Sequence, residues 1–254
     1  LRYDEEGVDE VRRKFFGTLY NTYSFFALYA NVDKFDPKAP AVPYERRPEI
    51  DRWIISLLNT LIKNVEASYE NYDVTSAGRM IQEFVCDHVS NWYVRLNRKR
   101  FWGSADNEDK LAAYQTLYEV LKDIAILAAP IAPFYMDQLY LDLVPDGEES
   151  VHYVMMPGYD EKVIDNDLEE RMELAQRASS MVLALRRKVN IKVRQPLSKL
   201  VIPVISDKVR GQLEKVKSLI LGEVNVKEAE FISDTTGIIT QKIKPNFKTL
   251  GKVY

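Results

Sequence analysis

The chain has 254 residues, of which 46% are hydrophobic, and its 35 Lys and Arg against 38 Asp and Glu give a formal net charge of −3. This length and composition are typical of a globular chain with one large core or two modest ones. No run approaches 18 uninterrupted apolar residues and the N-terminus has no signal-peptide apolar stretch, so the sequence predicts neither a membrane span nor secretion. The single cysteine, Cys86, excludes an internal disulfide and favours a reducing compartment, and only two histidines accompany it, too few for a Cys/His zinc site.

The first half of the chain has the apolar spacing of long amphipathic helices. Helices are expected over residues 8–30, from Ile50 to Val65, from Asp73 or Thr75 to about Phe101, from Asp106 or Asn107 to Ala129, and from about Phe134 to Leu143. Pro130 and Pro133 predict a corner between the last two helices, because each proline removes a backbone donor and disfavours helix in the preceding residue. Five such helices with short joints predict an antiparallel bundle.

After Pro145 the pattern changes to shorter elements. In chain order we expect a strand at Val151–Val154, an acidic loop at 158–166, a helix at 167–189 opened by Asp165 or Asp167, a strand at Leu200–Val204, a helix at 207–221, and strands at Val224–Ile232 and Gly237–Ile243. The predicted fold is therefore mainly α. A helical bundle spans residues 1–145, a linker with an additional helix packing on the bundle spans 146–190, and a small, incomplete α+β region spans 191–254.

Charge is unevenly distributed between the two halves. Residues 1–150 carry a net charge of −8, residues 151–254 carry +5, and residues from 174 onward carry +10. A basic half on an acidic chain favours a polyanionic partner that binds locally. A solvated basic face is an equally good explanation of the charge alone.

A first basic cluster lies at the expected C-terminal end of the third helix. Arg95, Arg98, Lys99 and Arg100 place four cations in six residues, among aromatic residues that include Trp102. Cations at a helix C-terminus oppose the helix dipole, which accounts for one or two of them. Guanidinium groups beside a groove can also fork onto phosphates or stack on unpaired bases, and the surplus favours that role.

A second basic cluster begins at another helix end. It contains five cations in nine residues, followed by an extended glutamine: Arg186, Arg187, Lys188, Lys192, Arg194 and Gln195. Charged edge strands that resist aggregation are the alternative explanation. Because the stretch continues a helix end already rich in arginine, contact with nucleic acid is favoured.

Catalytic patterns are absent from the sequence. No glycine-rich phosphate loop occurs, His88 lies beside an apolar stripe as a buried histidine would, and Cys86 is expected to act as a small hydrophobic residue. No nucleophile, base and orienting group come together in the pattern. The sequence predicts a binding protein.

Several stretches, spread over nearly the whole chain, resemble the C-terminal region of class I isoleucyl-tRNA synthetases. They are residues 11–23, Asp51-Arg52-Trp53-Ile54, 91–95 with 98–102, Ala129-Pro130-Ile131-Ala132-Pro133-Phe134, 192–197 and 244–251. The Asp-Arg-Trp and Ala-Pro-Ile-Ala-Pro-Phe stretches are also similar in the valyl and leucyl enzymes. The Arg-Gln-Pro-Leu and Lys-Pro-Asn-Phe-Lys stretches point to the isoleucyl enzyme.

The resemblance implies a helical bundle that packs on the anticodon stem-loop, with the α+β region contributing to the same RNA surface. The catalytic H-x-G-H and K-M-S-K-S motifs are missing, and so is an editing domain, so the chain is expected to be a piece of a cytoplasmic, monomeric isoleucine–tRNA ligase. Its expected partners are an isoleucine-accepting tRNA and the catalytic domain of the same parent chain. ATP and Mg²⁺ are expected to bind the parent, and no cofactor is expected in this piece.

The residues expected to contact tRNA are Arg95, Arg98, Lys99, Arg100, Trp102, Arg186, Arg187, Lys188, Lys192, Arg194 and Gln195. Those at the two helix ends would hold phosphates, while Arg194 and Gln195 would read splayed anticodon bases. Two other functions remain open: the equivalent domain of a valyl- or leucyl-tRNA synthetase, and a non-enzymatic helical scaffold that binds an acidic protein.

Overall fold

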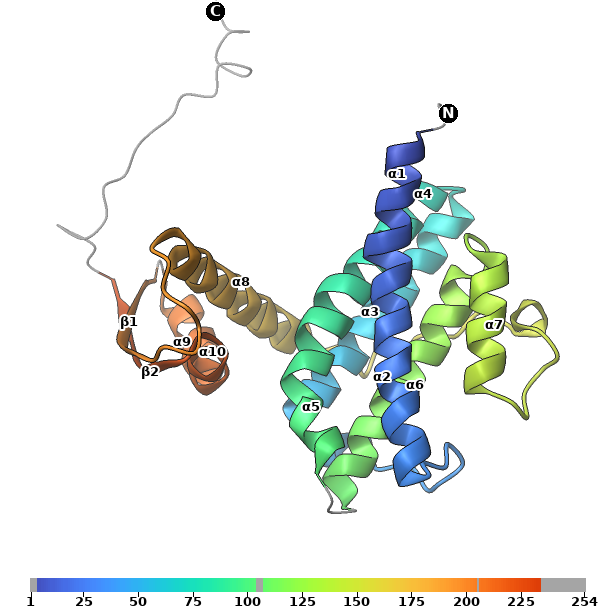
Figure 1. Ribbon diagram of the computed structural model, residues 1–254, viewed down its shortest axis with the longest axis horizontal. Helices are drawn as coiled ribbons and strands as arrows, with labels where there is room; N and C mark the ends of the chain where they lie inside the picture. Colours follow the sequence, from blue (N-terminus) through green and yellow to red (C-terminus); the bar gives the residue numbers. More distant parts are fainter. Residues whose placement is uncertain (1–3, 104–106, 205, 234–254) are drawn as a thin grey trace, which may run out of the picture. The chain divides into compact units, whose positions relative to one another are not determined.

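The computed structural model describes residues 4–103, 107–204 and 206–233, and the chain divides into two compact units, Leu1–Glu170 and Arg171–Tyr254. Apart from its connecting loops, the described part of the first unit consists of helices and contains no strand, and the second unit contains a small sheet (Figure 1). The predicted mainly α fold with a small α+β region is confirmed. The domain limits expected at residues 145 and 190 stay predictions.

The first unit is a helical bundle in which long helices pack side by side (Figure 1). In chain order its elements are α1 (Glu5–Val11), the π-helical stretch η1 (Arg12–Phe16), α2 (Gly17–Asp33), the 3-10 turn η2 (Tyr44–Arg46), α3 (Glu49–Glu70), α4 (Val74–Glu83), the π-helical stretch η3 (Phe84–Val94), α5 (Arg95–Trp102), α6 (Glu108–Ala128), α7 (Pro133–Leu143) and the 3-10 turn η4 (Val151–Tyr153). Since α1, η1 and α2 are continuous, and α4, η3 and α5 are too, these elements form the five long helices that the apolar spacing predicts.

The core of the bundle forms around α6. This helix contacts α2, α3, α4, α5 and α7, and its residues Leu117, Leu121 and Ile124 are fully buried. Trp53 and Leu58 of α3 are buried as well. Burial of such large apolar side chains, at roughly 1.5–3 kcal/mol each, is the main source of stability for a bundle of this kind.

Polar side chains cap the helices where the sequence predicts. Asp73 accepts a hydrogen bond from the Ser76 amide at 3.0 Å, and Asn107 accepts one from the Lys110 amide at 2.8 Å. Asp165 accepts one from the Leu168 amide at 3.0 Å, at the start of α8 (Asn166–Lys188). These bonds satisfy backbone donors that have no partner within a helix. Asp106, the other candidate cap for α6, lies outside the described residues.

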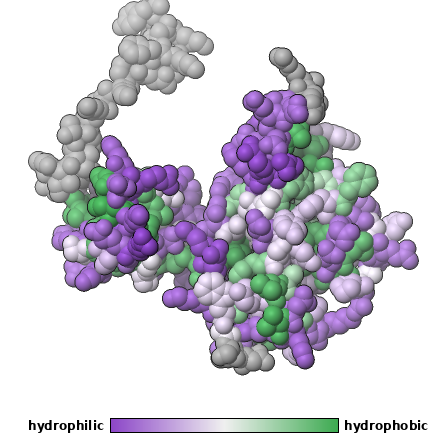
Figure 2. All heavy atoms as spheres, in the orientation of Figure 1, coloured by the Kyte–Doolittle hydropathy of each residue, from purple (hydrophilic) through white to green (hydrophobic). Residues whose placement is uncertain are grey.

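The N-terminal end of the first helix is rich in charged side chains. Hydrophilic residues gather there on the face shown in Figure 2. Asp9 pairs with Arg12 at 2.6 Å and with Arg13 at 2.9 Å, one helical turn away. These cations thus have a carboxylate partner within their own helix.

The second unit contains a parallel two-stranded sheet. Its elements are the C-terminal part of α8, then β1 (Leu197–Pro203), α9 (Asp207–Lys215), α10 (Lys217–Val224) and β2 (Val226–Ile232). Leu197 pairs with Val226 and Pro203 with Ile232, so the strands run in register over their whole length. Parallel neighbours need a crossover connection, which α9 and α10 supply.

Two expectations for this half of the chain are wrong, and one needs a new boundary. The strand expected at Val151–Val154 is the turn η4, because the Ser150 hydroxyl accepts from the His152 amide and starts a 3-10 turn. The helix expected over 207–221 is two helices interrupted at Val216, which has φ −107° and ψ 10°. The strand expected at Val224–Ile232 is present as β2, but it begins two residues later because Asn225 adopts a left-handed conformation, with φ 52°. The strand expected at Gly237–Ile243 lies outside the described residues.

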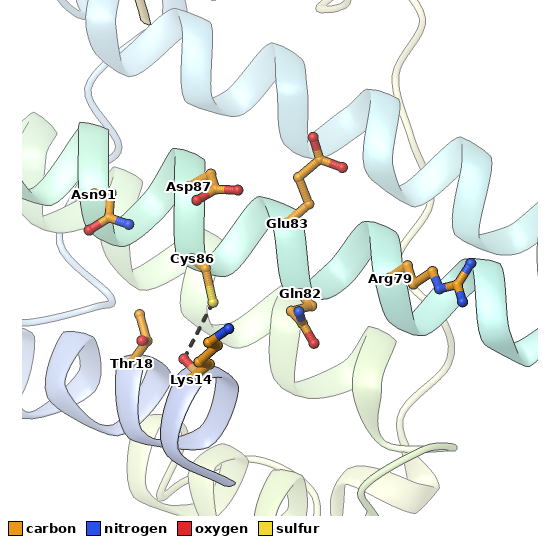
Figure 3. Close-up of a pocket in the computed structure, with 8 residues that line it drawn as sticks. All are labelled: Lys14, Thr18, Arg79, Gln82, Glu83, Cys86, Asp87 and Asn91. Atoms are coloured by element: carbon orange, nitrogen blue, oxygen red, sulfur yellow. Dashed lines mark hydrogen bonds between the residues drawn. The ribbon is translucent and has the colours of Figure 1, made fainter. Parts of the chain in front are cut away.

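The two π-helical stretches, η1 and η3, contact each other within the bundle. Beside them lies an open hollow of about 530 Å³, into which Lys14 and Thr18 project from one helix and Cys86 from the other (Figure 3). The Cys86 thiol donates a hydrogen bond to the Lys14 carbonyl at 3.5 Å. Burial, followed by the charge of Asp87, raises the pKa of the Cys86 thiol. Cys86 therefore stays protonated and joins two helices, which does not favour a reactive thiolate.

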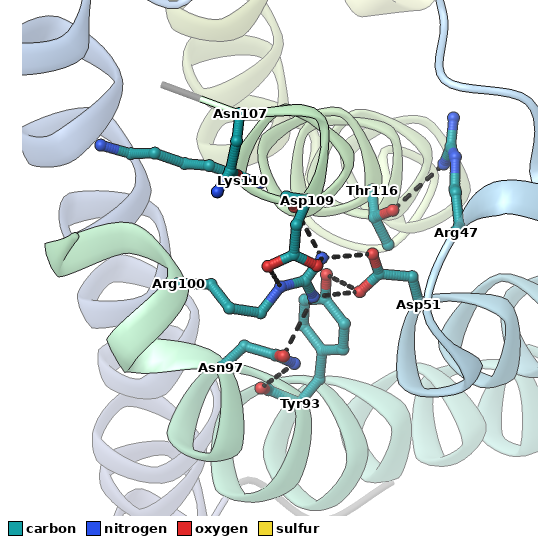
Figure 4. A network of polar contacts seen from close by, with 9 residues as sticks. All are labelled: Arg47, Asp51, Tyr93, Asn97, Arg100, Asn107, Asp109, Lys110 and Thr116. Atoms are coloured by element: carbon teal, nitrogen blue, oxygen red, sulfur yellow. Dashed lines mark hydrogen bonds and ion pairs between the residues drawn. The ribbon is translucent and has the colours of Figure 1, made fainter. Parts of the chain in front are cut away.

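A buried ion pair joins α3 to α5. Asp51 is fully buried, and the Arg100 guanidinium donates to both of its carboxylate oxygens, at 2.6 and 2.8 Å (Figure 4). The Tyr93 hydroxyl donates to the same carboxylate at 2.8 Å. Burial, with the charge of Asp51, raises the pKa of Tyr93 well above its ordinary value, so this phenol remains a donor.

The same guanidinium also reaches α6. Its Nε donates to the Asp109 carboxylate at 3.1 Å, and its Nη1 donates to the Asn97 side chain at 3.0 Å (Figure 4). Burial alone would lower the pKa of Arg100, but the hydrogen bonds and charge of Asp51 outweigh it and raise that pKa above the usual range. Arg100 therefore stays charged, and its guanidinium is bound by acceptors within the bundle.

Replacing Arg100 should destabilise the bundle strongly. In Arg100→Met the buried Asp51 carboxylate loses its cationic partner, which costs about 3–5 kcal/mol in free energy of unfolding. Arg98→Met, which changes an exposed cation on the same helix, should stay within about 0.5 kcal/mol of the unsubstituted chain. Urea denaturation measures both. Equal effects of the two substitutions would show that the ion pair does not hold the bundle together.

A second buried carboxylate lies on α6, and no guanidinium of the described residues pairs with it. Asp123 is 8% exposed, and its nearest cation, Lys122, is 3.6 Å away. Burial raises the pKa of Asp123 to about 6, and Lys122 offsets only part of that shift. The folded state therefore binds this proton more tightly than the unfolded state does, and Asp123 destabilises the fold progressively as pH rises from about 4 to about 6.

Asp123→Asn should remove this dependence on pH. Relative to the unsubstituted chain, the variant should gain about 2–3 kcal/mol in free energy of unfolding between pH 4 and pH 7, at 1.36 kcal/mol per pKa unit. Denaturant titrations at several pH values measure the difference. A difference that stays constant over this range contradicts the assignment.

Candidate nucleic-acid interface

The first basic cluster divides into exposed cations and one internal cation. Arg95, Arg98 and Lys99 are exposed on α5, whereas Arg100 is bound to Asp51 and Asp109 as described above. The sequence places Arg100 among the RNA-contacting residues, but the structure leaves its side chain only 14% exposed. We therefore assign Arg100 to fixing the helix end on which the other three lie.

The exposed members of this cluster differ in how firmly they are held. Arg95 donates from Nε to the Asn91 carbonyl at 2.8 Å, and its guanidinium lies 5.8 Å from the centre of the buried Trp92 ring. Arg98 and Lys99 make no side-chain hydrogen bond or ion pair to any residue that the structure describes. The Arg98 guanidinium and the Lys99 ammonium group are therefore accessible to an anion from solvent.

Trp102 ends the same helix with its side chain largely in solvent. It is 56% exposed, whereas Trp92 on the preceding turns is 4% exposed and belongs to the core. An exposed indole beside cations is a surface on which an unpaired base can stack. Residues 95–102 thus present three cations and one aromatic ring on one helix end.

The second basic cluster is organised by a buried arginine. Arg186, on α8, is 3% exposed. Its Nη1 donates to the carbonyls of Lys192 and Gln195 at 3.1 and 3.0 Å, and its Nη2 donates to the Asn225 carbonyl at 2.9 Å. One guanidinium therefore joins the residues after α8 to the residue before β2. Arg186 is a buried support of this surface.

Backbone hydrogen bonds complete this local structure. Asn190 is left-handed, with φ 56°, and the Ile191 amide donates to the Arg186 carbonyl at 2.9 Å, which is the usual hydrogen-bonded C-terminus of a helix. The Gln195 amide donates to the Lys192 carbonyl at 3.0 Å and closes a turn. The Asn225 side chain donates to the Val193 carbonyl at 2.8 Å. We call residues 189–196, fixed in this way, the clamped loop.

The remaining polar side chains of the cluster point to solvent. The exposed ones are Arg187, Lys188, Lys192, Arg194 and Gln195, none of which makes a side-chain hydrogen bond or ion pair within the described residues. No Asp or Glu occurs in the sequence from residue 174 to residue 206. The clamped loop and the end of α8 therefore present cations without a neighbouring carboxylate in the sequence.

Two residues that matter here were not found from the sequence. Asp51 and Asn225 hold Arg100 and the clamped loop in place, and both come from elements distant in sequence. Asn225 carries a local signal, since asparagine is favoured in the left-handed residue that ends a helix. Asp51 carries none, because an acidic residue in the first turn of a helix is ordinarily exposed.

Other kinds of site find no support in the described part of the chain. No three His, Cys, Asp or Glu side chains come close enough there to hold a metal ion. The hollow beside Cys86 has mixed charge, with Arg79 and Lys14 offset by Glu83 and Asp87 (Figure 3). No described helix is long and apolar enough to cross a membrane.

Comparison with known proteins points in the same direction as the geometry. Residues 51–202 match the family model of the anticodon-binding domain of tRNA ligase. The chain is 58% identical to an isoleucine–tRNA ligase of Bacteroides fragilis over 99% of its own length and 22% of that protein. It is 56% identical to the isoleucine–tRNA ligase of Porphyromonas gingivalis, over 100% of its own length and 22% of that protein. It is 42% identical to the isoleucine–tRNA ligase of Clostridium novyi, over 100% of its own length and 24% of that protein.

The chain therefore spans about a fifth of the length of these relatives. The match covers more than half of the chain, including most of the bundle, all of α8 and the clamped loop. The chain belongs to the family of anticodon-binding domains of tRNA ligases.

Proposed function

We propose that this chain holds the anticodon stem-loop of an isoleucine-accepting tRNA on behalf of an isoleucine–tRNA ligase. The observation that carries the proposal is the exposure of cations at two defined places, the end of α5 and the clamped loop with the end of α8. The isoleucine part rests on relatives that bear that name and match along the whole chain. The parent would act in the cytoplasm as a monomer, and its catalytic domain would supply the ATP and Mg²⁺ sites.

The two places have complementary chemistry for RNA. Lys and Arg neutralise phosphates whatever the sequence, which supplies affinity and makes binding depend on salt. Unpaired loop bases, by contrast, are recognised by stacking and by hydrogen bonds to their edges. Arg98, Lys99, Arg187 and Lys188 have the exposure needed for phosphates, whereas Trp102, Arg194 and Gln195 are suited to bases.

The role of the chain is positional. By fixing the stem-loop at a constant place, it would orient the acceptor end of the tRNA for aminoacylation elsewhere in the parent. Holding a reactant in the right geometry lowers the activation free energy of the reaction, because its translational and rotational freedom is lost on binding and not in the chemical step. No side chain described here needs to take part in bond formation.

The proposal predicts a specific salt dependence. The double variant Arg98→Ala/Lys99→Ala should weaken binding of the chain to an isoleucine tRNA anticodon stem-loop. It should also reduce the magnitude of the slope of log affinity against log salt concentration by about 1–2, because each phosphate contact contributes about 0.7–0.9 to that slope. Arg187→Ala/Lys188→Ala should act in the same way. Fluorescence anisotropy at several salt concentrations measures both.

Arg12→Ala/Arg13→Ala is the matched control, because these exposed arginines of the first helix are paired with Asp9. It should leave affinity and slope unchanged. If all three double variants behave alike, the assignment of the cations is wrong. If a valine or leucine tRNA stem-loop binds equally well, the isoleucine part fails while the family assignment stands.

A further inference from the structure

A small hollow lies against the clamped loop, within the second unit. Its volume is about 310 Å³, at the lower end of the range for ligand pockets. Apolar side chains and polar ones share its lining, which contains Leu183, Ile191 and Val193 together with Arg186, Arg187, Asn190 and Lys192. Apolar side chains beside a guanidinium and an amide are more than a site that only attracts phosphate needs.

The walls of this hollow are fixed before any ligand arrives. Arg186 donates to the carbonyls of Lys192 and Gln195, and Asn225 donates to that of Val193. The αL conformation of Asn190 and the bond from the Ile191 amide to the Arg186 carbonyl end the helix at the same place. A preformed site avoids the entropic cost of ordering a loop when a ligand binds.

We propose that this hollow receives one unpaired nucleobase of the anticodon loop, with Arg186 as the positioning residue that shapes it. The proposal rests on the proposed tRNA function and specifies its site. A base has an apolar face for Val193 and Ile191, and a polar edge for the Asn190 amide.

The charge around the hollow favours a nucleotide over an uncharged ring. Arg187, Lys188 and Lys192 line the hollow or lie next to it in the sequence, and no carboxylate occurs from residue 174 to residue 206. The phosphates on either side of a splayed base would meet these cations. The Arg186 Nε–H is buried and lacks a hydrogen-bond partner among the described residues, so an acceptor on the ligand could satisfy it after a small adjustment.

The test fills the hollow without changing its charge. Val193→Trp places an indole where the base would enter, since the 43%-exposed Val193 lines the hollow. Val189→Trp adds the same ring to the same loop, at a residue that is 62% exposed and does not line the hollow. The probe is an isoleucine tRNA anticodon stem-loop, intact or with one anticodon base removed to leave an abasic site.

The expected result has two parts. Val193→Trp should weaken binding of the intact stem-loop by about fivefold or more, the effect of losing one stacked base, with an unchanged salt slope because no phosphate contact is lost. One of the three abasic stem-loops should bind the unsubstituted chain about fivefold more weakly than the intact stem-loop does. Val193→Trp should not weaken the binding of that abasic stem-loop any further. Val189→Trp should bind every probe as the unsubstituted chain does.

Equal binding by the two tryptophan variants overturns the inference and leaves the tRNA function intact. Failure of the unsubstituted chain to bind any stem-loop overturns both. Displacement of the stem-loop by a polyglutamate peptide at the same charge concentration would identify a site for acidic protein and also overturn it. Arg186→Lys gives an independent readout: faster amide hydrogen exchange at Gln195 and Ile191 should accompany weaker binding, with an unchanged salt slope.

Discussion

The bidentate pair between Arg100 and the buried Asp51 is the constraint on which the first unit depends. It fixes the last turns of α5 against the first turn of α3, and through Asp109 against the start of α6. Removing Arg100 would leave the buried Asp51 carboxylate without its cation. Because Arg100 is held inward, the exposed Arg98 and Lys99 on the neighbouring positions are held at a constant place on the surface.

The second unit repeats this arrangement with a different acceptor. Arg186 is buried like Arg100, but its guanidinium binds three backbone carbonyls in place of a carboxylate. In both units one arginine of a basic cluster is internal and its neighbours are exposed. The internal arginine supplies rigidity, and the exposed cations supply the charge that an RNA backbone would meet.

Much of the fold could be predicted from the sequence, because long helices with regular apolar spacing carry a strong local signal. The caps Asp73 and Asn107 and the corner at Pro133 follow from single residues acting on adjacent backbone. The wrong predictions concern short elements, such as η4, whose form depends on one hydroxyl. The basic clusters were visible, but the inward direction of Arg100 and Arg186 was not, since Asp51 and Asn225 are remote in sequence.

The clamped loop is held by its own carbonyl oxygens, which accept from the side chains of Arg186 and Asn225. Lys192, Val193 and Gln195 accept hydrogen bonds by their carbonyl oxygens, and no side chain of these three residues takes part in those bonds. Side chains at these positions can therefore be exchanged while the backbone path is kept. Such a loop is a platform on which recognition of a different RNA loop could evolve, or be engineered, by substitution at few positions and without rebuilding the fold.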